Sequence, residues 1–241
     1  MILVSKSQIK LITSLHQKKY RDKLGLFVAE GPKVIKELLD AGIKLHSLFS
    51  TENFNGITQN FYIVTKREIN KISFLKTANT SLAVFEIPSQ RPISEKGIII
   101  ALDAVRDPGN LGTIIRICDW FGVTQLVCSL DTVDFYNPKV VQASMGSNSR
   151  VNVLYVSLRE YIEKSSLPIY GGCLEGESVF SQSLPKDVVI VLGNEANGIS
   201  KEINSLLTKK ITIPQFGDQQ KTESLNVATA AAIIISEFKR K

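Results

Sequence analysis

Polar side chains follow two strongly apolar runs of the sequence, where strands of a sheet would end. Asn110 and Arg116 come after the run 98–102, and Glu195 comes after the run 188–192. The isoleucines beside Arg116 suggest that its helix is largely buried, and a buried guanidinium needs an anionic partner. We therefore predict that Arg116 is buried and pairs with Glu195. The competing interpretation is that Arg116 is a solvated helix residue.

Asn110 also has a simpler role open to it. The chain turns at Asp-Pro-Gly, and we predict that a helix begins at Asn110, because asparagine is a good N-cap residue. A third segment resembles the first two in layout. It passes from Ile213-Pro214 through a polar loop to Ser224-Leu225-Asn226, and small residues follow. The helix expected after them consists largely of small residues, which would let another group approach its backbone closely. The alternative interpretation is ordinary tight packing of this helix.

The elements that must position these residues alternate between strand and helix. The near-continuous apolar strands indicate a parallel sheet covered on both faces, so the fold class is α/β. Ligands of such sheets bind beyond the carboxyl ends of the strands. We expect strands at 97–102, 125–128, 151–156, 169–173, 188–192 and 211–213, and helices at 111–121, 138–145, 201–207 and 223–238.

A separate region precedes this one. Two prolines within residues 87–92 mark the boundary, and shorter elements before it indicate a small α/β domain. We expect helices at 7–15 and 33–40 and strands at 26–29, 45–49, 61–64 and 82–85. Residues 1–90 hold 13 Lys+Arg against 7 Asp+Glu, whereas residues 91–241 hold 16 of each, so the whole surplus of +6 lies in the first region. This asymmetry slightly favours an anionic polymer as partner over a merely basic surface.

Composition excludes several classes of protein. The longest apolar runs are too short to span a bilayer, and no apolar core of signal-peptide length follows Met1, so we expect a soluble cytoplasmic protein. The spacing of the three cysteines fits neither a zinc site nor a disulfide framework, and neither histidine has a partner at metal-ligand spacing. We expect no bound metal.

The three polar segments together carry a family resemblance. Their patterns are Asn-x-Gly-x-x-x-Arg, Gly-x-Glu-x-x-Gly and Ile-Pro followed by Ser-Leu-Asn-Val. In this order they resemble the three motifs of the SpoU (TrmH) family of SPOUT methyltransferases, and residues 143–147 are similar to a segment between the first two. The resemblance covers residues 97–241. Residues 1–90 resemble, more loosely, the substrate-binding domain of the family, which is similar to RNA-binding ribosomal proteins.

The resemblance implies S-adenosylmethionine-dependent methylation of a ribose 2′-hydroxyl in structured RNA. It also implies a deep trefoil knot in the second domain and a homodimer whose active site draws on both subunits. Knots are nearly absent from proteins, so pattern reasoning would have rejected this topology. By similarity, the cofactor would contact Leu192, Gly193, Ile213, Leu225 and Asn226, and the polar catalytic set would be Asn110, Arg116, Glu195, Ser224 and Asn226.

We expect Arg116 to stay charged, because a neutral arginine is not accessible in a protein. It would hold the RNA phosphate and stabilise the developing alkoxide, while a phosphate oxygen or water takes the proton. Glu195 would orient Arg116, and Asn110 would position the ribose. The loop 215–223 is longer than is usual in the family, which leaves its contacts with the cofactor open.

Several alternatives remain at this stage. Ribosomal RNA is the favoured substrate, because a separate basic domain suits a large structured RNA, but a transfer RNA ribose is also possible. So are methylation of a base nitrogen and a non-catalytic RNA-binding protein with the same fold. A Rossmann dehydrogenase is disfavoured, because the required glycines follow none of the predicted strands. The modified nucleotide cannot be read from the sequence.

Overall fold

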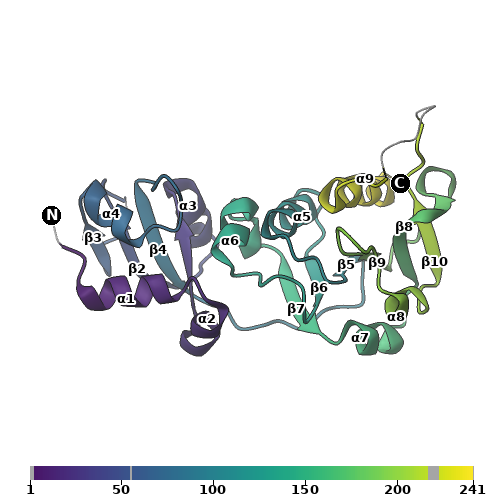
Figure 1. The fold of residues 1–241 in the computed structure, drawn as a ribbon, viewed down its shortest axis with the longest axis horizontal. Coiled ribbons are helices and arrows are strands. Elements are labelled where there is room, and N and C mark those ends of the chain that lie inside the picture. Colours follow the sequence, from purple (N-terminus) through teal and green to yellow (C-terminus); the bar gives the residue numbers. More distant parts are fainter. Residues whose placement is uncertain (1–2, 55, 217–222, 241) are drawn as a thin grey trace. The chain divides into compact units, whose positions relative to one another are not determined.

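The computed structural model describes residues 3–54, 56–216 and 223–240. Contacts between Cα atoms divide the chain into two units (Figure 1). The first contains Met1–Ser89 and also Asp134–Ser149, and the second contains Gln90–Val133 and Arg150–Lys241. The segment Asp134–Ser149 lies inside the predicted range 97–241, yet it packs within the first unit.

The first unit is a four-stranded sheet between two layers of helices. The strands lie in the order β1-β4-β2-β3, and all neighbours are antiparallel except β2 and β3. The strands are β1 (Leu26–Glu30), β2 (Leu45–Ser50), β3 (Phe61–Ile63) and β4 (Ser81–Glu86). The helices are α1 (Lys6–Ser14), α2 (Lys18–Leu24), α3 (Pro32–Asp40), α4 (Lys66–Ile72) and α6 (Pro138–Ser144), with a 3-10 turn at Ser147–Ser149.

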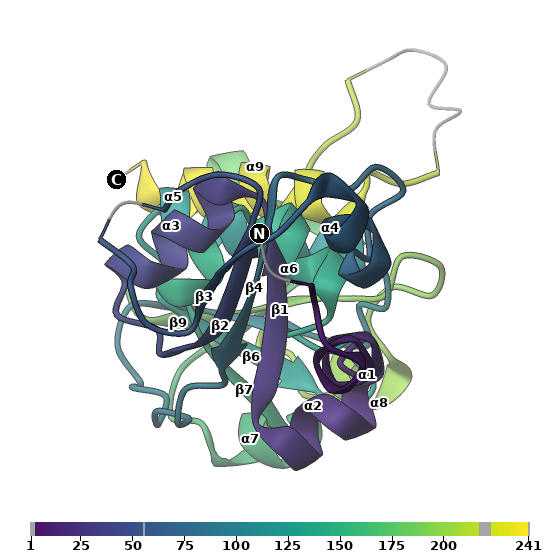
Figure 2. The same cartoon turned by 90° about the vertical axis from the view of Figure 1, so that its left-hand side faces the viewer.

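Alternate residues of β1 face two separate cores in this unit. Val28 packs beneath α1 and α4, whereas Phe27 packs beneath α3 and α6. In Figure 2, α1 and α4 lie on one side of the strands and α3 on the other. The segment Asp134–Ser149 is held by an ion pair as well as by apolar contacts. The guanidinium of Arg21, which is only 2% exposed, donates from Nε to Asp134 Oδ2 over 2.9 Å.

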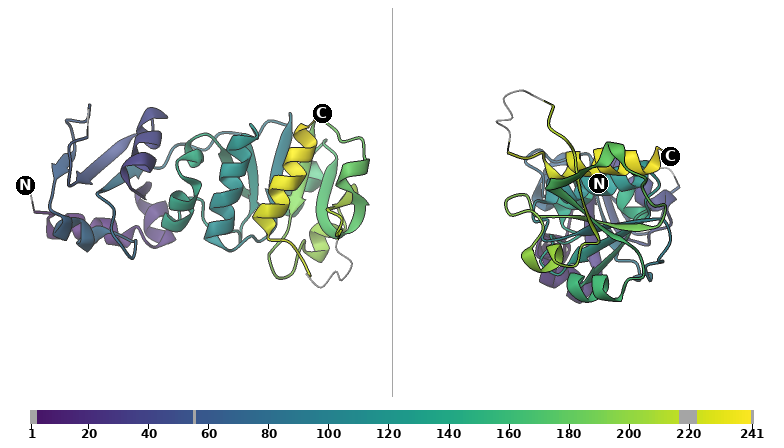
Figure 3. Two further views of the ribbon diagram at one scale, coloured as in Figure 1. Left: turned by 90° about the horizontal axis from the view of Figure 1, so that it is seen from above. Right: turned by 90° about the vertical axis from the view of Figure 1, so that its right-hand side faces the viewer.

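The second unit is a six-stranded parallel sheet in the order β10-β8-β9-β5-β6-β7. Helices α5 and α9 pack side by side over one face, visible in teal and yellow in the left view of Figure 3. Apolar residues of α7 and α8 cover the other face. The strands are β5 (Ile98–Leu102), β6 (Gln125–Ser129), β7 (Asn152–Val156), β8 (Ile169–Ser178), β9 (Val188–Leu192) and β10 (Lys209–Thr212). The helices are α5 (Pro108–Trp120), α7 (Leu158–Lys164), α8 (Lys201–Asn204) and α9 (Val227–Lys239), with a 3-10 turn at Val179–Ser181.

The predicted α/β class and the parallel sheet are confirmed. The expected strands and helices are all present, with ends that shift by a few residues. Three short helices were not predicted, namely α2, α4 and α7. Two of them follow the N-cap residues Thr65 and Ser157, whose hydroxyls cap the helix, but seven residues are too few to show a clear apolar period. Within the described residues, no helix is long and apolar enough to cross a membrane.

Candidate active site

The first motif enters α5 through a cap at Asp107 rather than at Asn110. The Asp107 carboxylate accepts a hydrogen bond from the Asn110 backbone N–H over 2.8 Å, and Pro108 occupies the first helical turn. The prediction that Asn110 is the N-cap is therefore wrong. Aspartate followed by proline is itself an N-cap signature, because the fixed φ of proline suits the first turn. The Asn110 side chain is consequently available for contacts outside its helix.

A chain of hydrogen bonds joins the three motifs through Asn110. Its Nδ2 donates to Glu195 Oε1 over 2.9 Å, and its Oδ1 accepts from Asn226 Nδ2 over 2.8 Å. Asn226 in turn caps α9, because its Oδ1 accepts from the backbone N–H groups of Ala228 and Thr229. Three residues that are far apart in the sequence thus orient one another at one edge of the sheet. We call Asn226, Asn110 and Glu195 the relay.

The second motif forms a tight turn after β9. Asn194 closes it, because its backbone N–H and C=O both pair with Gly198 over 2.9 Å, and its Oδ1 accepts from the N–H groups of Ala196 and Asn197. A Cβ on Gly193 would lie 2.1 Å from the carbonyl carbon of Gly198. Only glycine therefore fits at position 193.

Arg116 is exposed on α5, which contradicts the prediction of a buried arginine. Ile114 and Ile115 are buried as expected, but Trp120, one turn from Arg116, is 84% exposed. Residues four apart share one face of a helix, so Arg116 and Trp120 point away from the core together. Among the described residues, Arg116 forms neither an ion pair nor a hydrogen bond, and the predicted pairing with Glu195 is absent. Glu195 bonds to Asn110 instead.

The residues predicted to hold the cofactor differ in exposure. Leu192 and Gly193 are buried, and the Leu192 carbonyl accepts from the Asp103 N–H over 2.9 Å. Ile213 is half-buried, Leu225 is 48% exposed, and Ser224 is exposed. Residues 217–222 of the predicted long loop lie outside the described residues. The residues predicted to hold the cofactor therefore provide both main-chain polar groups and partly exposed apolar side chains beyond the ends of β9 and β10.

Sequence reasoning missed two residues that build this edge. The buried carboxylate of Asp103 accepts from the Ser200 N–H over 2.7 Å, which fixes the start of α8. Asn194 Nδ2 donates to the Ala104 carbonyl over 2.7 Å, and Ala104 has a φ of 57°, which is unusual for a residue other than glycine. An asparagine after a strand is a known turn former, so Asn194 carried a readable signal. Asp103 carried none beyond its place after a strand.

The loop after β5 is held by a second polar cluster. Ser129 Oγ accepts from the Ala104 N–H over 2.9 Å and donates to Asp131 Oδ1 over 2.7 Å. The Ser129 hydroxyl, and after it the Arg106 guanidinium, hold the pKa of Asp131 below its usual value. Within the described ranges, no group of three or more His, Cys, Asp or Glu side chains could hold a metal ion. The polar groups described at the carboxyl ends of the strands are thus the amides of Asn110 and Asn226, the carboxylate of Glu195 and, on α5, the guanidinium of Arg116, which is unpaired among the described residues.

Two family models match this chain, one in each of its two regions. Residues 97–236 match the model of the SpoU rRNA methylase family, and residues 6–83 match the model of the MRM3-like substrate binding domain. The chain is 28% identical over 243 aligned residues to the 23S rRNA (guanosine(2553)-2′-O)-methyltransferase RlmP of Bacillus subtilis, covering 95% of this chain and 94% of that protein.

Two solved structures resemble the whole chain. A TrmH-family protein from Porphyromonas gingivalis superposes with a TM-score of 0.89 at 34% identity, covering 99% of both chains. The AdoMet-bound rRNA methyltransferase of Sinorhizobium meliloti superposes with a TM-score of 0.85 at 29% identity, covering 99% of this chain and 97% of that one. The family model spans more than half of the sequence and includes all three motifs joined by the relay, and the chain belongs to the SpoU rRNA methylase family.

Proposed function

We propose that this protein transfers a methyl group from S-adenosylmethionine to a ribose 2′-hydroxyl of ribosomal RNA. The observation that carries the proposal is the relay, which brings together one polar residue from each family motif over 2.8 and 2.9 Å. The relatives agree in chemistry, since RlmP and several RlmB proteins are named 23S rRNA 2′-O-methyltransferases. The match of residues 6–83 to a substrate-binding domain supports a large RNA substrate.

The residues at the ends of β9 and β10 suit this cofactor. The exposed Leu225 and half-buried Ile213 offer apolar surface for an adenine ring, and the turn Gly193–Gly198 offers main-chain polar groups. We propose that Leu192 contributes only its backbone, because its side chain faces the core. When bound, the cofactor supplies a methyl group on a positively charged sulfur.

Arg116 is the residue best suited to hold the substrate. Its guanidinium has no partner among the described residues, and a planar fork of donors matches a phosphate in two places. We propose that Arg116 binds the RNA phosphate and stabilises the negative charge that develops on the ribose oxygen. The ribose proton would leave to a phosphate oxygen or to water. Asn110, Glu195 and Asn226 position the reacting groups, and Ser224 adds a hydroxyl beside Asn226.

We propose that the protein acts as a homodimer through the exposed face of α5. Trp120 is 84% exposed there, and tryptophan is among the side chains that are enriched in protein–protein interfaces. Arg116 shares this face, so its guanidinium would lie at the interface between the two copies. Light scattering should give twice the mass of the chain, and Trp120→Glu should give monomers. A wild-type monomer would contradict this arrangement.

Two further features stay proposals. The deep trefoil knot rests on membership of the family and would be tested by tracing the C-terminal segment in a crystal structure. The cytoplasmic location would be tested by cell fractionation.

The experiment that tests the function uses unmodified ribosomal RNA and transfer RNA with radiolabelled S-adenosylmethionine. We expect label in ribosomal RNA, in a linkage that resists alkali, because a methylated 2′-hydroxyl cannot attack the adjacent phosphate. Label in an alkali-sensitive linkage would indicate a base as target. Label confined to transfer RNA would show that transfer RNA, and not ribosomal RNA, is the substrate. Failure to bind the cofactor by calorimetry would overturn the proposal.

A further inference from the structure

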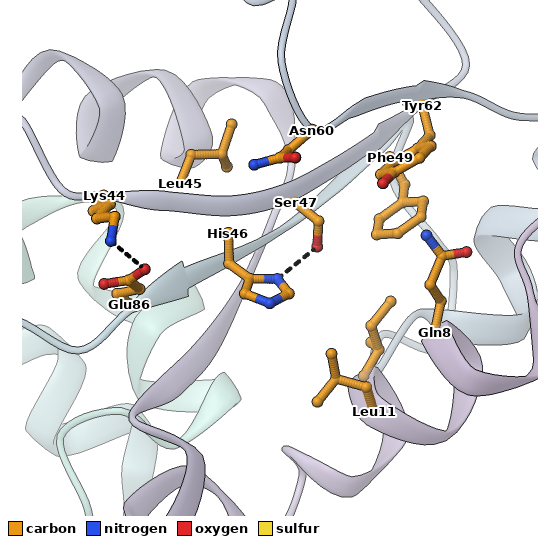
Figure 4. A pocket seen from close by; sticks show the side chains of 11 residues that line it. Gln8, Leu11, Lys44, Leu45, His46, Ser47, Phe49, Asn60, Tyr62 and Glu86 are labelled. Atoms are coloured by element: carbon orange, nitrogen blue, oxygen red, sulfur yellow. Dashed lines mark hydrogen bonds and ion pairs between the residues drawn. The ribbon is translucent and has the colours of Figure 1, made fainter.

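A cavity of about 390 Å³ opens in the first unit between α1 and the strands β2 and β3. It lies within the size range of sites for small organic ligands. Figure 4 shows its lining, with Gln8 and Leu11 from α1, His46 and Ser47 from β2, and Tyr62 from β3. None of these residues belongs to the three motifs, so the proposed methyl transfer leaves this cavity unexplained.

The cavity exists because β2 has a partner on one side only along part of its length. β3 pairs with Leu48–Ser50 and not with the residues before them. Opposite β4, the register of β2 shifts between Leu45 and Ser47, so His46 is an extra residue. Such a bulge redirects side chains and is common beside binding sites. Here it lets His46 Nδ1 and Ser47 Oγ lie 3.3 Å apart, although Ser47 is only 7% exposed.

One wall of the cavity is aromatic. The ring of Tyr62 stacks on Phe49, with centroids 5.0 Å apart and an angle of 16° between the planes. Phe49 is fully buried and holds the ring in place, while Tyr62 is half-buried and lines the cavity. A fixed aromatic ring at an opening offers a flat apolar surface on which another ring can stack.

Amide groups surround this ring. Gln8 Oε1 accepts from the Ser5 backbone N–H over 2.9 Å, which leaves the Gln8 NH₂ group pointing elsewhere. The Asn60 side chain forms no hydrogen bond with the residues that the structure describes, although the Asn60 carbonyl accepts from the Leu48 N–H over 2.8 Å. The Asn60 amide therefore presents a donor and an acceptor side by side, as the edge of a nucleobase does, whereas Gln8 offers its NH₂ donors.

The charges at the cavity mouth are almost balanced. Lys44 Nζ lies 2.8 Å from Glu86 Oε1, and both side chains are well exposed. Exposed pairs of this kind are worth little, so Lys44 can exchange the carboxylate for a phosphate at small cost. Glu86 would then lie beside the same phosphate, and its negative charge would oppose the binding of further phosphate groups.

We propose that this cavity receives one unpaired nucleotide of the RNA substrate. Its base stacks on Tyr62, the amides of Asn60 and Gln8 contact the edge of the base, and Lys44 contacts its phosphate. RNA is recognised in this manner at loops and bulges, where bases leave the helix and stack on aromatic side chains. The inference rests on the proposed function for the identity of the ligand, and it adds that the first unit selects an RNA with an unstacked base at a fixed place.

The test uses a short RNA hairpin that carries the fluorescent base 2-aminopurine, either unpaired in the loop or paired in the stem. The full-length protein is titrated into each RNA, and both affinity and quenching are measured. We expect tighter binding and stronger quenching for the loop position. Tyr62→Leu should weaken binding of the loop RNA by about tenfold, within the range measured for loss of base stacking. Asn60→Gly should weaken it by about threefold, as for one hydrogen bond.

Tyr20→Leu is the matched control. Tyr20 is a partly exposed tyrosine of the same unit that does not line the cavity, and we expect its loss to leave quenching unchanged. If Tyr62→Leu fails to fold, Lys44→Ala and Asn60→Gly carry the test, because both side chains are exposed and both variants should bind the loop RNA more weakly. Glycine also accommodates the positive φ of Asn60, 54°.

Three results would overturn the proposal. One is equal binding and quenching for the loop and stem positions, and another is equal loss for Tyr62→Leu and Tyr20→Leu. The third is displacement of the hairpin by free nucleoside monophosphates at the same nucleotide concentration, which would make a free nucleotide the ligand. Methyl transfer is assayed separately. An active enzyme with an unresponsive cavity would refute only this inference, whereas base-dependent quenching without methyl transfer would refute only the proposed function.

Discussion

Replacing Asn110 with aspartate tests the relay without changing its shape. The introduced carboxylate would meet Glu195 Oε1 where an N–H donor now lies at 2.9 Å. Two unit charges at this distance repel by about 1.4 kcal/mol in bulk water and by about 6 kcal/mol at an effective dielectric constant of 20. Because Glu195 is exposed and Asn110 half-buried, we expect the lower part of this range, roughly 1.5–3 kcal/mol. That corresponds to a loss of about 10- to 150-fold in kcat/KM for methyl transfer.

The same geometry predicts rescue in two ways. A pair of carboxyl groups shares a proton more readily as the pH falls, which replaces the repulsion by a hydrogen bond. The defect of Asn110→Asp should therefore shrink from pH 8 towards pH 5.5, whereas that of Asn110→Ala should not. The double variant Asn110→Asp, Glu195→Gln restores one donor and one acceptor and should recover much of the lost rate. Steady-state kinetics that show a double variant no better than Asn110→Asp would refute the relay as a functional unit.

The remaining predictions concern other parts of the molecule. Gly193→Ala places a Cβ against backbone atoms of Gly198 and should abolish cofactor binding in calorimetry, whereas Gly42→Ala, whose added Cβ would meet no atom within 4 Å, should affect stability alone. Arg116→Ala and Arg116→Lys should both lose methyl transfer but keep cofactor affinity, and normal turnover by either would remove Arg116 from the mechanism. Burial raises the pKa of Cys118 to about 12 from an ordinary value of 9.0, so only the unfolded state ionises between these values. Stability should therefore fall as the pH rises above about 9, less steeply in Cys118→Ala, and equal slopes in urea unfolding would contradict this. RNA affinity should fall steeply with salt concentration if the basic first unit contacts phosphates, and salt-insensitive binding would show that it does not.

The fold was accessible from the sequence wherever apolar residues form continuous runs. Val188–Leu192 was located to the residue and Ile98–Leu102 to within one residue, because a strand buried on both faces consists almost entirely of apolar side chains. The order of the strands in the sheet could not be predicted. For example, β10 lies beside β8 rather than beside β9, which precedes it in the sequence. That order depends on how helices cover the sheet, which no local pattern records.

Three of the residues predicted for the site lie together in the structure, but the partner predicted for one of them was wrong. The family motifs gave Asn110, Glu195 and Asn226, but the partner of Glu195 was predicted to be Arg116. The error came from the assumption that apolar neighbours bury a helix residue. The face of α5 that carries Arg116 and the apolar Trp120 is exposed, and an apolar side chain on such a face cannot be told from a core residue without knowing what lies against it.

The path of the chain through Asp134–Ser149 restricts how the protein can be divided or recombined. A fragment that ends near residue 90 would retain the buried guanidinium of Arg21 without the carboxylate of Asp134. Breaking a buried ion pair in this way lowers the free energy of unfolding by about 3–5 kcal/mol. The same fragment would lose the contact between the rings of Phe27 and Tyr136, whose centroids lie 4.8 Å apart. A chimera that exchanges the first domain between relatives therefore has to exchange Asp134–Ser149 with it. In evolution these two separate stretches of the gene are expected to change together.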